Sequence, residues 1–160
     1  MGPIGGPRTE NAMREYGRAY HLVDIENLLA LTHGIPVWAD ARSLYNSVAG
    51  VEDDDLLFVA ADHSRWFDLK VAFPGAEVRP GYGTDGADLA LINGIDLELV
   101  ARRFDTVVIG SGDNRFIDVA YRARHFGLNV VVVSRPQSLS RSLASYADFV
   151  IEMPELEFAA

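Results

Sequence analysis

The stretch TVVIGSGDNRFID, residues Thr106–Asp118, decides the fold that we predict for this chain. Its first four residues, TVVI, are apolar or β-branched without interruption, which is typical of a strand buried on both faces of a parallel sheet. The next four, GSGD, turn the chain, and apolar residues then recur at helical spacing as far as Gly127, a glycine suited to ending the helix. Asp113 therefore follows the carboxyl end of a central strand, at the edge where open α/β sheets bind ligands. The alternative is that Ser111 or Asp113 only caps the helix.

Segments with strand character alternate with helical patterns along the rest of the chain. Besides the strand that begins at Thr106, the predicted strands are Ala19–Val23, Leu56–Ala60, Glu77–Arg79, Asn129–Ser134 and an edge segment at Asp148–Glu152. The predicted helices cover residues 37–48, 63–73, 85–103 and 138–146, in addition to the helix that ends near Gly127. Such alternation predicts βαβ units with right-handed crossovers. We therefore expect an α/β fold, a three-layer α/β/α sandwich around a mostly parallel sheet of about five strands.

The length and composition indicate one globular domain. A chain of 160 residues is long enough for a single domain with its own core. Its 49% hydrophobic and 23% charged residues match an ordered globular protein rather than a disordered one. Residues 1–18 are rich in glycine and proline, so we predict a flexible N-terminal arm with a turn of helix near Asn11–Tyr16. Residues 19–160 are then expected to form the domain.

Three features of the sequence favour a cytoplasmic protein. No apolar run approaches the roughly 18 residues needed to span a bilayer, so no membrane partner is expected. The first residues, MGPIGGPRTE, lack the basic and apolar segments of a signal peptide. The sequence contains no cysteine, which excludes disulfides, thiolate metal sites and a thiol nucleophile, and the cytoplasm is then the simplest location.

The charge of the chain restricts how it could bind nucleic acid. The formal net charge is −9, and Lys70 is the only lysine. This argues against a protein held on nucleic acid by a broad basic surface, because phosphate contacts normally need such a patch. An enzyme that reaches a phosphodiester through bound divalent cations is still compatible with the charge, since such a site requires clustered carboxylates.

Asp88 occupies an unusual place on the helix predicted over residues 85–103. Ile92, Ile95 and Leu99 follow it at steps of four, three and four residues, which is one face of a helix. That face is apolar and is expected to point inward, yet it begins with a carboxylate. Because an isolated buried charge is costly, this aspartate must be capped, paired or bound to a metal.

Three aspartates, Asp24, Asp88 and Asp113, are expected at one edge of the sheet, and we call them the acidic triad. Asp24 ends the first strand, and the carboxyl ends of parallel strands meet at the same edge. The helix of Asp88 also follows a strand, so its N-terminus opens there. Carboxylate oxygens are the ligands that Mg²⁺ and Mn²⁺ prefer, and such a site can activate water against a phosphodiester. The alternative is three independent helix caps.

Four segments of the chain resemble, in this order, the motifs of a known family. They are VDIEN at Val23–Asn27, GADLALIN at Gly86–Asn93, GSGDNRF at Gly110–Phe116 and ASYADFVIE at Ala144–Glu152. The family that they resemble is the NYN domains of the PIN-like nuclease superfamily, and the resemblance is to the LabA-like kind. The resemblance covers most of the chain from about Ala19 to Glu152, and it implies a PIN-like, Rossmann-like fold.

The resemblance also implies roles for individual residues. The acidic triad would be both catalytic and metal-binding, with Mg²⁺ or Mn²⁺ as the cofactor. Asn27 would orient Asp24 or the substrate phosphate, and Ser111 and Asn114 would contact substrate or water. The implied reaction is metal-dependent hydrolysis of RNA phosphodiester bonds, and the implied partner is single-stranded or structured RNA.

Arg115 departs from the family pattern. The family motif carries an aspartate at this position, and an aspartate about two turns into the helix of Asp88 is also missing, where Asn93 and Gly94 stand. Three roles stay open for Arg115: it replaces the charge of a metal, it binds a phosphate, or it silences the site. The alternative function is therefore a catalytically weakened PIN-like module that binds RNA or a protein partner.

Other motifs of the chain are less informative. The segment Gly81-x-Gly83-x-x-Gly86 spells a dinucleotide-binding fingerprint, but it follows the third predicted strand instead of the first. We expect it to be a turn that brings Asp85 and Asp88 to the sheet edge. His63 also follows a strand end, where the start of a helix is the favoured interpretation. A homodimer is a further expectation for so small a domain, although no apolar stripe in the sequence identifies an interface.

Overall fold

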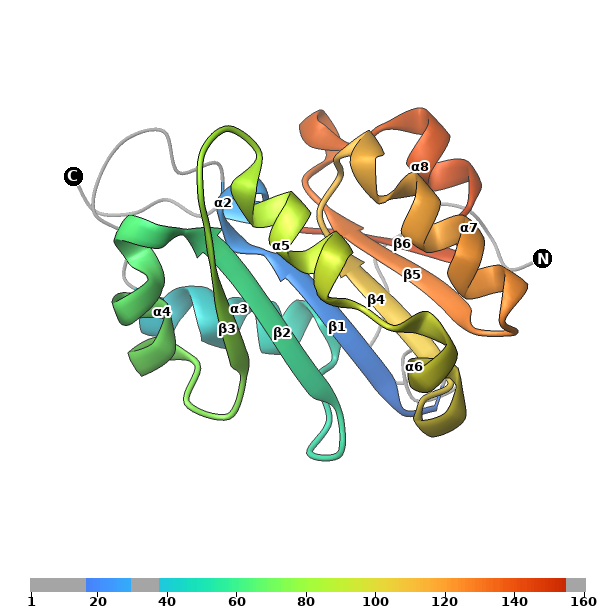
Figure 1. The fold of residues 1–160 in the computed structure, drawn as a ribbon, viewed down its shortest axis with the longest axis horizontal. Helices are drawn as coiled ribbons and strands as arrows, with labels where there is room; N and C mark the ends of the chain where they lie inside the picture. The colour runs from blue at the N-terminus through green and yellow to red at the C-terminus, as the bar shows by residue number, and fades with distance from the viewer. Residues whose placement is uncertain (1–16, 30–37, 155–160) are drawn as a thin grey trace.

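The computed structural model describes residues 17–29 and 38–154 of the chain. At their centre lies a parallel six-stranded sheet with helices on both faces (Figure 1). The strands are β1 (Ala19–Asp24), β2 (Leu56–Asp62), β3 (Glu77–Gly81), β4 (Thr106–Gly110), β5 (Asn129–Ser134) and β6 (Phe149–Glu152). The predicted α/β class is confirmed, with six strands instead of about five because the edge segment pairs fully with β5. The helical turn predicted near residues 11–16 lies outside the described residues.

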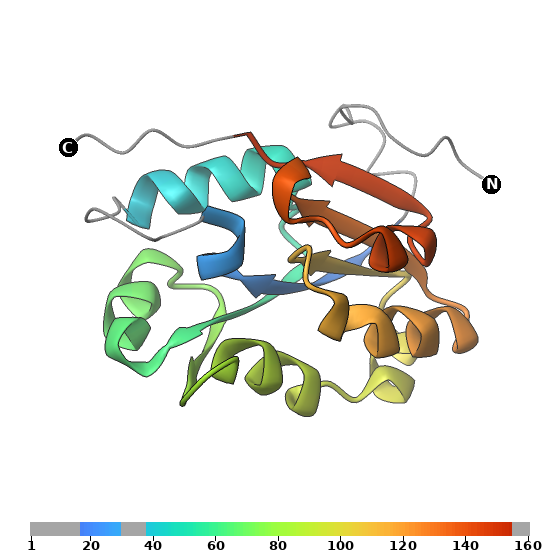
Figure 2. The same ribbon diagram turned by 90° about the horizontal axis from the view of Figure 1, so that it is seen from above.

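Helices cover both faces of the sheet and make three layers (Figure 2). They are α2 (Ile25–Leu29), α3 (Trp38–Ala49), α4 (Trp66–Ala72), α5 (Gly86–Gly94), α6 (Leu97–Arg103), α7 (Ile117–His125) and α8 (Arg141–Ser145). Side chains of α2, α3 and α4 pack into the core on one face, and those of α5 to α8 pack into the core on the other. In the part of the chain that the structure describes, no helix is long and apolar enough to cross a membrane.

The β4 strand shows why its sequence reads as a continuous apolar run. Val108 points into the core beneath α2, α3 and α4, whereas Val107 and Ile109 point into the core beneath α5 to α8. Successive side chains of a strand point to opposite faces, so a strand covered on both faces buries every residue. All five residues of β4 are buried, as the sequence predicts.

The strand order β3-β2-β1-β4-β5-β6 shows where a ligand-binding crevice is expected at the edge of the sheet. From β1 the chain adds β2 and β3 on one side, and it then crosses back to place β4, β5 and β6 on the other. β1 and β4 are therefore neighbours, with Val23 paired to Gly110. The crevice beyond their carboxyl ends is the topological switch point, where ligands bind in open α/β sheets.

The prediction of one long helix over residues 85–103 is wrong, because two helices, α5 and α6, occupy this segment. α5 ends at Gly94, Ile95 is extended, and the Asp96 side chain accepts a hydrogen bond from the Leu99 N–H at 3.1 Å to begin α6. Glycine weakens a helix interior, and aspartate favours the N-cap position, so the two residues together end one helix and start the next. As a result Leu99 is 47% exposed, although the unbroken helix would have turned it inward.

A buried polar network lies between β1, α3 and the start of β2. The His21 ring contacts the Tyr45 hydroxyl through Nδ1 and the Asp55 carboxylate through Nε2, both at 2.9 Å. Asp55 also accepts the N–H groups of Ala19 at 3.0 Å and Glu52 at 3.2 Å. Burial by itself raises the pKa of Asp55, but the hydrogen bonds from His21 and Ala19 outweigh burial and lower that pKa below its ordinary value.

Candidate active site

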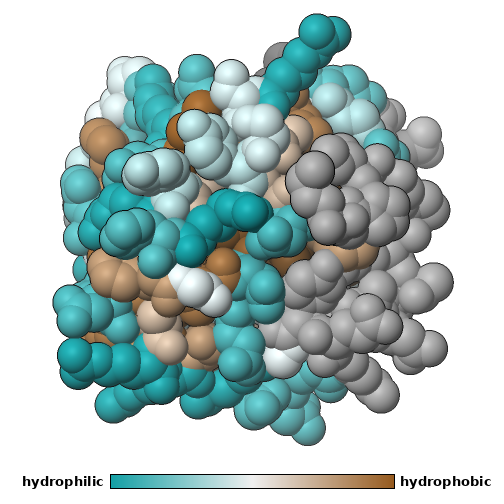
Figure 3. All heavy atoms as spheres, turned by 90° about the vertical axis from the view of Figure 1, so that its right-hand side faces the viewer, coloured by the Kyte–Doolittle hydropathy of each residue, from teal (hydrophilic) through white to brown (hydrophobic). Residues whose placement is uncertain are grey.

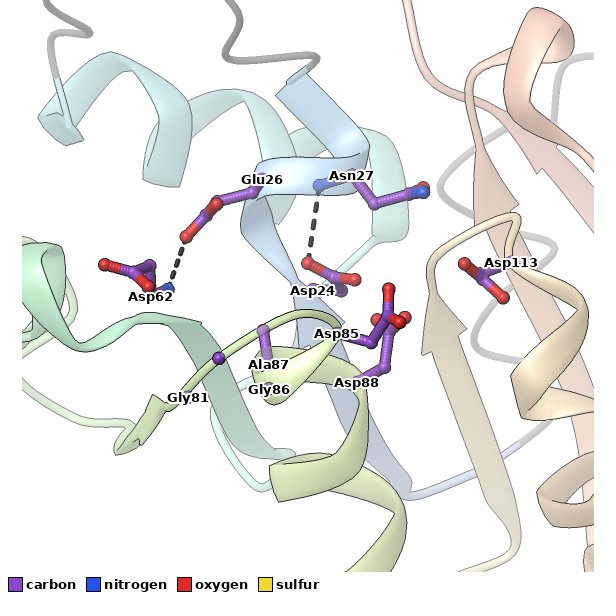
Figure 4. A pocket seen from close by; sticks show the side chains of 11 residues that line it. Asp24, Glu26, Asn27, Asp62, Gly81, Asp85, Gly86, Ala87, Asp88 and Asp113 are labelled. Carbon is purple, nitrogen blue, oxygen red and sulfur yellow. Dashed lines mark hydrogen bonds between the residues drawn. The ribbon is translucent and has the colours of Figure 1, made fainter.

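A cavity of about 290 Å³ opens at the carboxyl ends of β1 and β4 (Figure 4). It is lined by Asp24, Glu26, Asn27, Asp62, Gly81, Gly83, Asp85, Gly86, Ala87, Asp88 and Asp113. We call this cavity the acidic pocket, because carboxylates from four segments of the chain reach it. The acidic triad and Asn27 all line it, at the edge of the sheet that the sequence indicates.

Asp24 stands at the end of β1 and is buried. One of its oxygens accepts the Asn27 N–H at 3.3 Å, so the carboxyl group caps the first turn of α2. Its carboxyl group also faces that of Asp88 in the middle of the acidic pocket (Figure 4). Burial first, and then the neighbouring Asp88 carboxyl group, raise the pKa of Asp24 to about 9. At neutral pH the pair therefore holds a proton unless a cation neutralises it.

Asp88 lies in the first turn of α5 and is only 5% exposed. Its Oδ2 is 3.4 Å from Nη1 of Arg115, whereas its Oδ1 is buried with no hydrogen-bond partner among the described residues. A buried oxygen without a donor is costly unless something else satisfies it. Oδ1 of Asp88 is thus a ready ligand for a cation in the acidic pocket.

Arg115 ties the acidic pocket to the turn before α5. Its guanidinium forms an ion pair with Asp85 and lies at 3.4 Å from Asp88, while it stays partly exposed to solvent. Asp85 adopts a left-handed backbone with φ of 61°, which costs of order 1 kcal/mol in a residue other than glycine. Although Asp85 is the N-cap residue of α5, its carboxylate makes no capping bond and pairs with Arg115 instead.

Asp113 both caps a helix and lines the acidic pocket. Its carboxylate accepts the Arg115 N–H at 2.9 Å and so caps the 3₁₀ turn η2 (Asn114–Phe116) that precedes α7. Asp113 therefore makes a capping hydrogen bond, and its side chain also lines the acidic pocket, so capping is not its only place in the structure.

Ser111 and Asn114 do not have the surroundings expected of substrate-binding residues. Ser111 is 0% exposed, and its Oγ accepts the N–H of Asp113 at 3.2 Å. A side chain without exposed surface cannot touch a substrate in this structure, so the predicted substrate contact of Ser111 is replaced by a positioning contact. Asn114 is exposed in η2. It follows Asp113 in the chain but is not one of the described residues that line the acidic pocket.

Asn27 joins the ends of three neighbouring strands. Its Oδ1 accepts the Gly112 N–H at 3.1 Å, just beyond β4. Its carbonyl oxygen accepts two hydrogen bonds from Arg135, beyond β5, at 3.1 and 3.0 Å. The side chain thus holds the β4 turn against the end of β1. The sequence does not reveal this role of Arg135, because the contact is made to a backbone oxygen far away in the chain.

The glycine-rich turn before α5 fixes the position of Asp88. A side chain on Gly81 would collide with the backbone of Gly86 and Ala87, so the end of β3 touches the start of α5 backbone to backbone. Gly83 between them has φ of +75°, which glycine adopts without strain. The turn therefore carries Asp85 and Asp88 to the sheet edge, as expected. The glycines of the dinucleotide-like segment are explained by this close backbone contact and by the positive φ of Gly83.

The donor set of the acidic pocket fits a divalent cation in part. Among the residues that the structure describes, no group of three or more acidic or histidine side chains is close enough to hold a metal ion. The Asp24 and Asp88 carboxyl groups lie together, whereas Asp113 stands apart on the β4 side (Figure 4). The two carboxylates of Asp24 and Asp88, whose oxygens include the orphan Oδ1 of Asp88, suit Mg²⁺, which keeps several waters and often takes only one or two protein carboxylates.

Comparison with known proteins agrees with this fold, which is that of NYN and PIN-like domains. The NYN domain family model matches residues 20–154, so the chain belongs to the NYN domain family. A protein of unknown function from Vibrio parahaemolyticus has a similar crystal structure, with a TM-score of 0.63 and 19% sequence identity. The likeness covers 87% of this chain and 94% of that one. The comparison with curated proteins found no match.

Proposed function

We propose that this protein is a metal-dependent ribonuclease that hydrolyses RNA phosphodiester bonds in the acidic pocket. Its family belongs to a superfamily of nucleases. The observation that carries the proposal is the buried Asp24–Asp88 pair, with an oxygen of Asp88 left without a donor. A bound cation would satisfy that oxygen and cancel the repulsion between the two carboxylates.

Asp24 and Asp88 would hold one Mg²⁺ or Mn²⁺. When bound, the cation supplies charge stabilisation for the phosphodiester and lowers the pKa of water. Asp113 reaches the pocket from the other side and would orient the attacking water and accept its proton. The water oxygen bonds to phosphorus, the bond from phosphorus to the leaving oxygen breaks, and the leaving oxygen takes up a proton from solvent. The Asn27 N–H donates to the Asp24 carboxylate and keeps it in position. The Ser111 Oγ accepts the Asp113 N–H, and the Asn27 Oδ1 accepts the neighbouring Gly112 N–H, so both hold the turn that carries Asp113.

Arg115 would supply positive charge where a second cation would otherwise be needed. Its contacts with Asp85 and Asp88 support this role among the three that the sequence leaves open. The guanidinium is also exposed enough to meet a substrate phosphate. We therefore propose a site with one metal ion, assisted by one arginine.

A cleavage assay tests the proposal. A mixture of single-stranded and structured RNA is incubated with the protein and Mn²⁺, with excess EDTA, and with Asp113→Asn. Asp118→Asn is the matched control, because Asp118 is an exposed aspartate on α7 that pairs with Arg122. We expect cleavage by the wild type and the control, and none with EDTA or with Asp113→Asn. Cleavage that survives in Asp113→Asn would overturn the assigned site.

The second candidate function is a weakened PIN-like module that binds RNA or a protein partner. The ion pairs of Arg115 favour it, because they occupy carboxylates that could otherwise bind a metal. The distinguishing measurement is metal affinity. A folded protein that binds no Mn²⁺ at millimolar concentration would support the binding module over the enzyme.

A further inference from the structure

Two exposed aromatic rings are stacked beside the acidic pocket. The rings of His63 and Tyr82 lie 5.0 Å apart between centroids, with an angle of 15° between their planes. Tyr82 is 70% exposed, and the His63 side chain is 55% exposed. A pair so exposed contributes little to a core, and the large exposed surface of Tyr82 can accept another flat ring.

The backbone places this pair on the rim of the acidic pocket. Tyr82 stands between Gly81 and Gly83, and His63 follows Asp62, and these three neighbours all line the pocket. Asp62 and Gly81 lie on the side of the pocket opposite Asp113 (Figure 4). The ring pair therefore flanks the place where the reacting phosphate is proposed to bind.

Local contacts fix the backbone of the two turns that carry the rings. The contact of Gly81 with the start of α5 fixes the turn that carries Tyr82. The Asp62 carboxylate accepts the Ser64 N–H at 3.0 Å and so caps the 3₁₀ turn η1 (His63–Arg65) that carries His63. Because these turns are already ordered, little backbone entropy is lost when a ligand stacks on the ring pair, which favours binding.

A second hollow adjoins the acidic pocket, next to Tyr82. It has a volume of about 470 Å³, shares Gly86 with the acidic pocket, and is lined in part by Tyr82, Arg79 and Asn93. It therefore combines an aromatic face, a guanidinium and an amide. These are the groups that bind a base by stacking, a phosphate by charge and a base edge by hydrogen bonds.

We infer that Tyr82, supported by His63, is a stacking platform for a nucleobase next to the phosphodiester in the acidic pocket. The inference rests on the proposed function and adds a substrate class to it. A base stacks on a protein ring only when it is unpaired, so the platform selects RNA that is single-stranded beside the bond that is cut. Base stacking also suits an acidic protein, because the ring contacts the face of the base and not a phosphate.

The test measures stacking and cleavage separately. Stacking is followed by the quenching of 2-aminopurine in a short single-stranded RNA, in an Asp113→Asn background so that the RNA stays intact. Cleavage is followed by KM and kcat in the presence of Mn²⁺. The variants are Tyr82→Ala, Tyr82→Phe and, as the matched control, Tyr121→Ala, because Tyr121 is an exposed tyrosine on α7.

We expect Tyr82→Ala to abolish the quenching and to raise KM by about 5- to 100-fold, with kcat little changed. Tyr82→Phe keeps the ring and should retain both properties, as should Tyr121→Ala. An RNA without a base beside the cut should be cleaved equally by the wild type and Tyr82→Ala. Quenching that depends on Tyr82 without any cleavage would support the platform and overturn the proposed ribonuclease. Cleavage with the same KM and quenching in Tyr82→Ala would overturn the platform alone.

Discussion

Asp24 and Asp88 face each other in a buried part of the acidic pocket. Two ionised carboxylates repel each other and only accept hydrogen bonds, so each needs a donor or a cation that the other cannot supply. The Asn27 N–H satisfies one oxygen of Asp24, and Arg115 lies near one oxygen of Asp88. The remaining oxygens share a proton or a cation. The chemistry of the site therefore depends on which of the two is present.

The stability of the protein should depend jointly on pH and metal. Asp24 has a folded-state pKa of about 9, above the unfolded value of about 3.9. The folded chain thus keeps a proton that the unfolded chain releases, so the contribution of Asp24 to stability in EDTA is greatest below about pH 4 and declines as the pH rises toward 9. A cation that replaces this proton should raise the Tm more at pH 8 than at pH 6.

Thermal unfolding with and without Mn²⁺ at the two pH values measures this effect. Asp88→Asn removes the charge that binds the cation, so the increase in Tm should largely disappear in this variant. Asp118→Asn should behave as the wild type. An increase in Tm that is equal at both pH values would contradict a cation that replaces the proton of Asp24.

The contribution of the Asp55 carboxylate to stability should change with pH in the opposite sense to that of Asp24, because the pKa of Asp55 is lowered. Its folded-state pKa is lowered, so its contribution is present above about pH 3.9 and is lost as the pH falls through the folded-state value. Asp55→Asn weakens the bonds to His21 and Ala19 and should lower the free energy of unfolding at pH 7 by about 1–3 kcal/mol. Urea unfolding should show a smaller difference at pH 3, and Asp53→Asn, at an exposed neighbouring site, should have little effect at either pH.

The sequence could predict the residues of the site that stand at strand ends, but not their contacts. Asp24 and Asp113 follow apolar runs, and Asp88 begins an apolar face, so their place at the sheet edge follows from local pattern alone. The ion pair between Arg115 and Asp85 joins residues far apart in the chain, and no local pattern reveals it. The burial of Ser111 likewise depends on tertiary packing, which the polarity of serine does not indicate.

At the scale of the helices and strands, the buried parallel strands were the most predictable part of the fold. The apolar runs of β2, β4 and β5 are long enough to identify, and all of the predicted strands are present. The break between α5 and α6 was missed because the apolar spacing continues across it. The cap at Asp96 and the low helix propensity of Gly94 outweigh that spacing.

The contact between β3 and α5 should be sensitive to a single methyl group. Gly81→Ala would push the start of α5 away, because the new Cβ meets the backbone of Ala87 instead of a flexible side chain. We expect a loss of about 1–3 kcal/mol in the free energy of unfolding and weaker Mn²⁺ binding, because Asp88 moves with α5. Gly75→Ala is the control, since its Cβ meets nothing within 4 Å. Equal stability and metal affinity in the two variants would show that this contact does not position Asp88.

At the scale of the whole molecule, the formal net charge of −9 means that the proposed RNA substrate would be held by a few contacts. On the face shown in Figure 3, hydrophilic side chains predominate among the coloured residues, and apolar ones show in small separate areas. That view offers no support for the expected homodimer, which stays a prediction, as do the cytoplasmic location and the domain limits at residues 19–160.

The salt dependence of RNA binding should therefore be shallow. At constant Mg²⁺, the affinity of Asp113→Asn for a short single-stranded RNA should fall less than about tenfold between 50 and 200 mM monovalent salt. A protein that makes many phosphate contacts loses roughly a thousandfold or more over this range. Fluorescence anisotropy measures the dependence, and a loss of that larger size would show that binding relies on a basic surface.

The rate of RNA cleavage as a function of Mn²⁺ concentration tests the central claim most directly. It is measured for the wild type, Asp88→Asn and the control Asp118→Asn, all with folding confirmed by their Tm. The account predicts a rate that rises with Mn²⁺ and saturates in the wild type and the control, and no cleavage above background in Asp88→Asn. Cleavage by Asp88→Asn with the same dependence on Mn²⁺ would contradict a catalytic metal held in the acidic pocket.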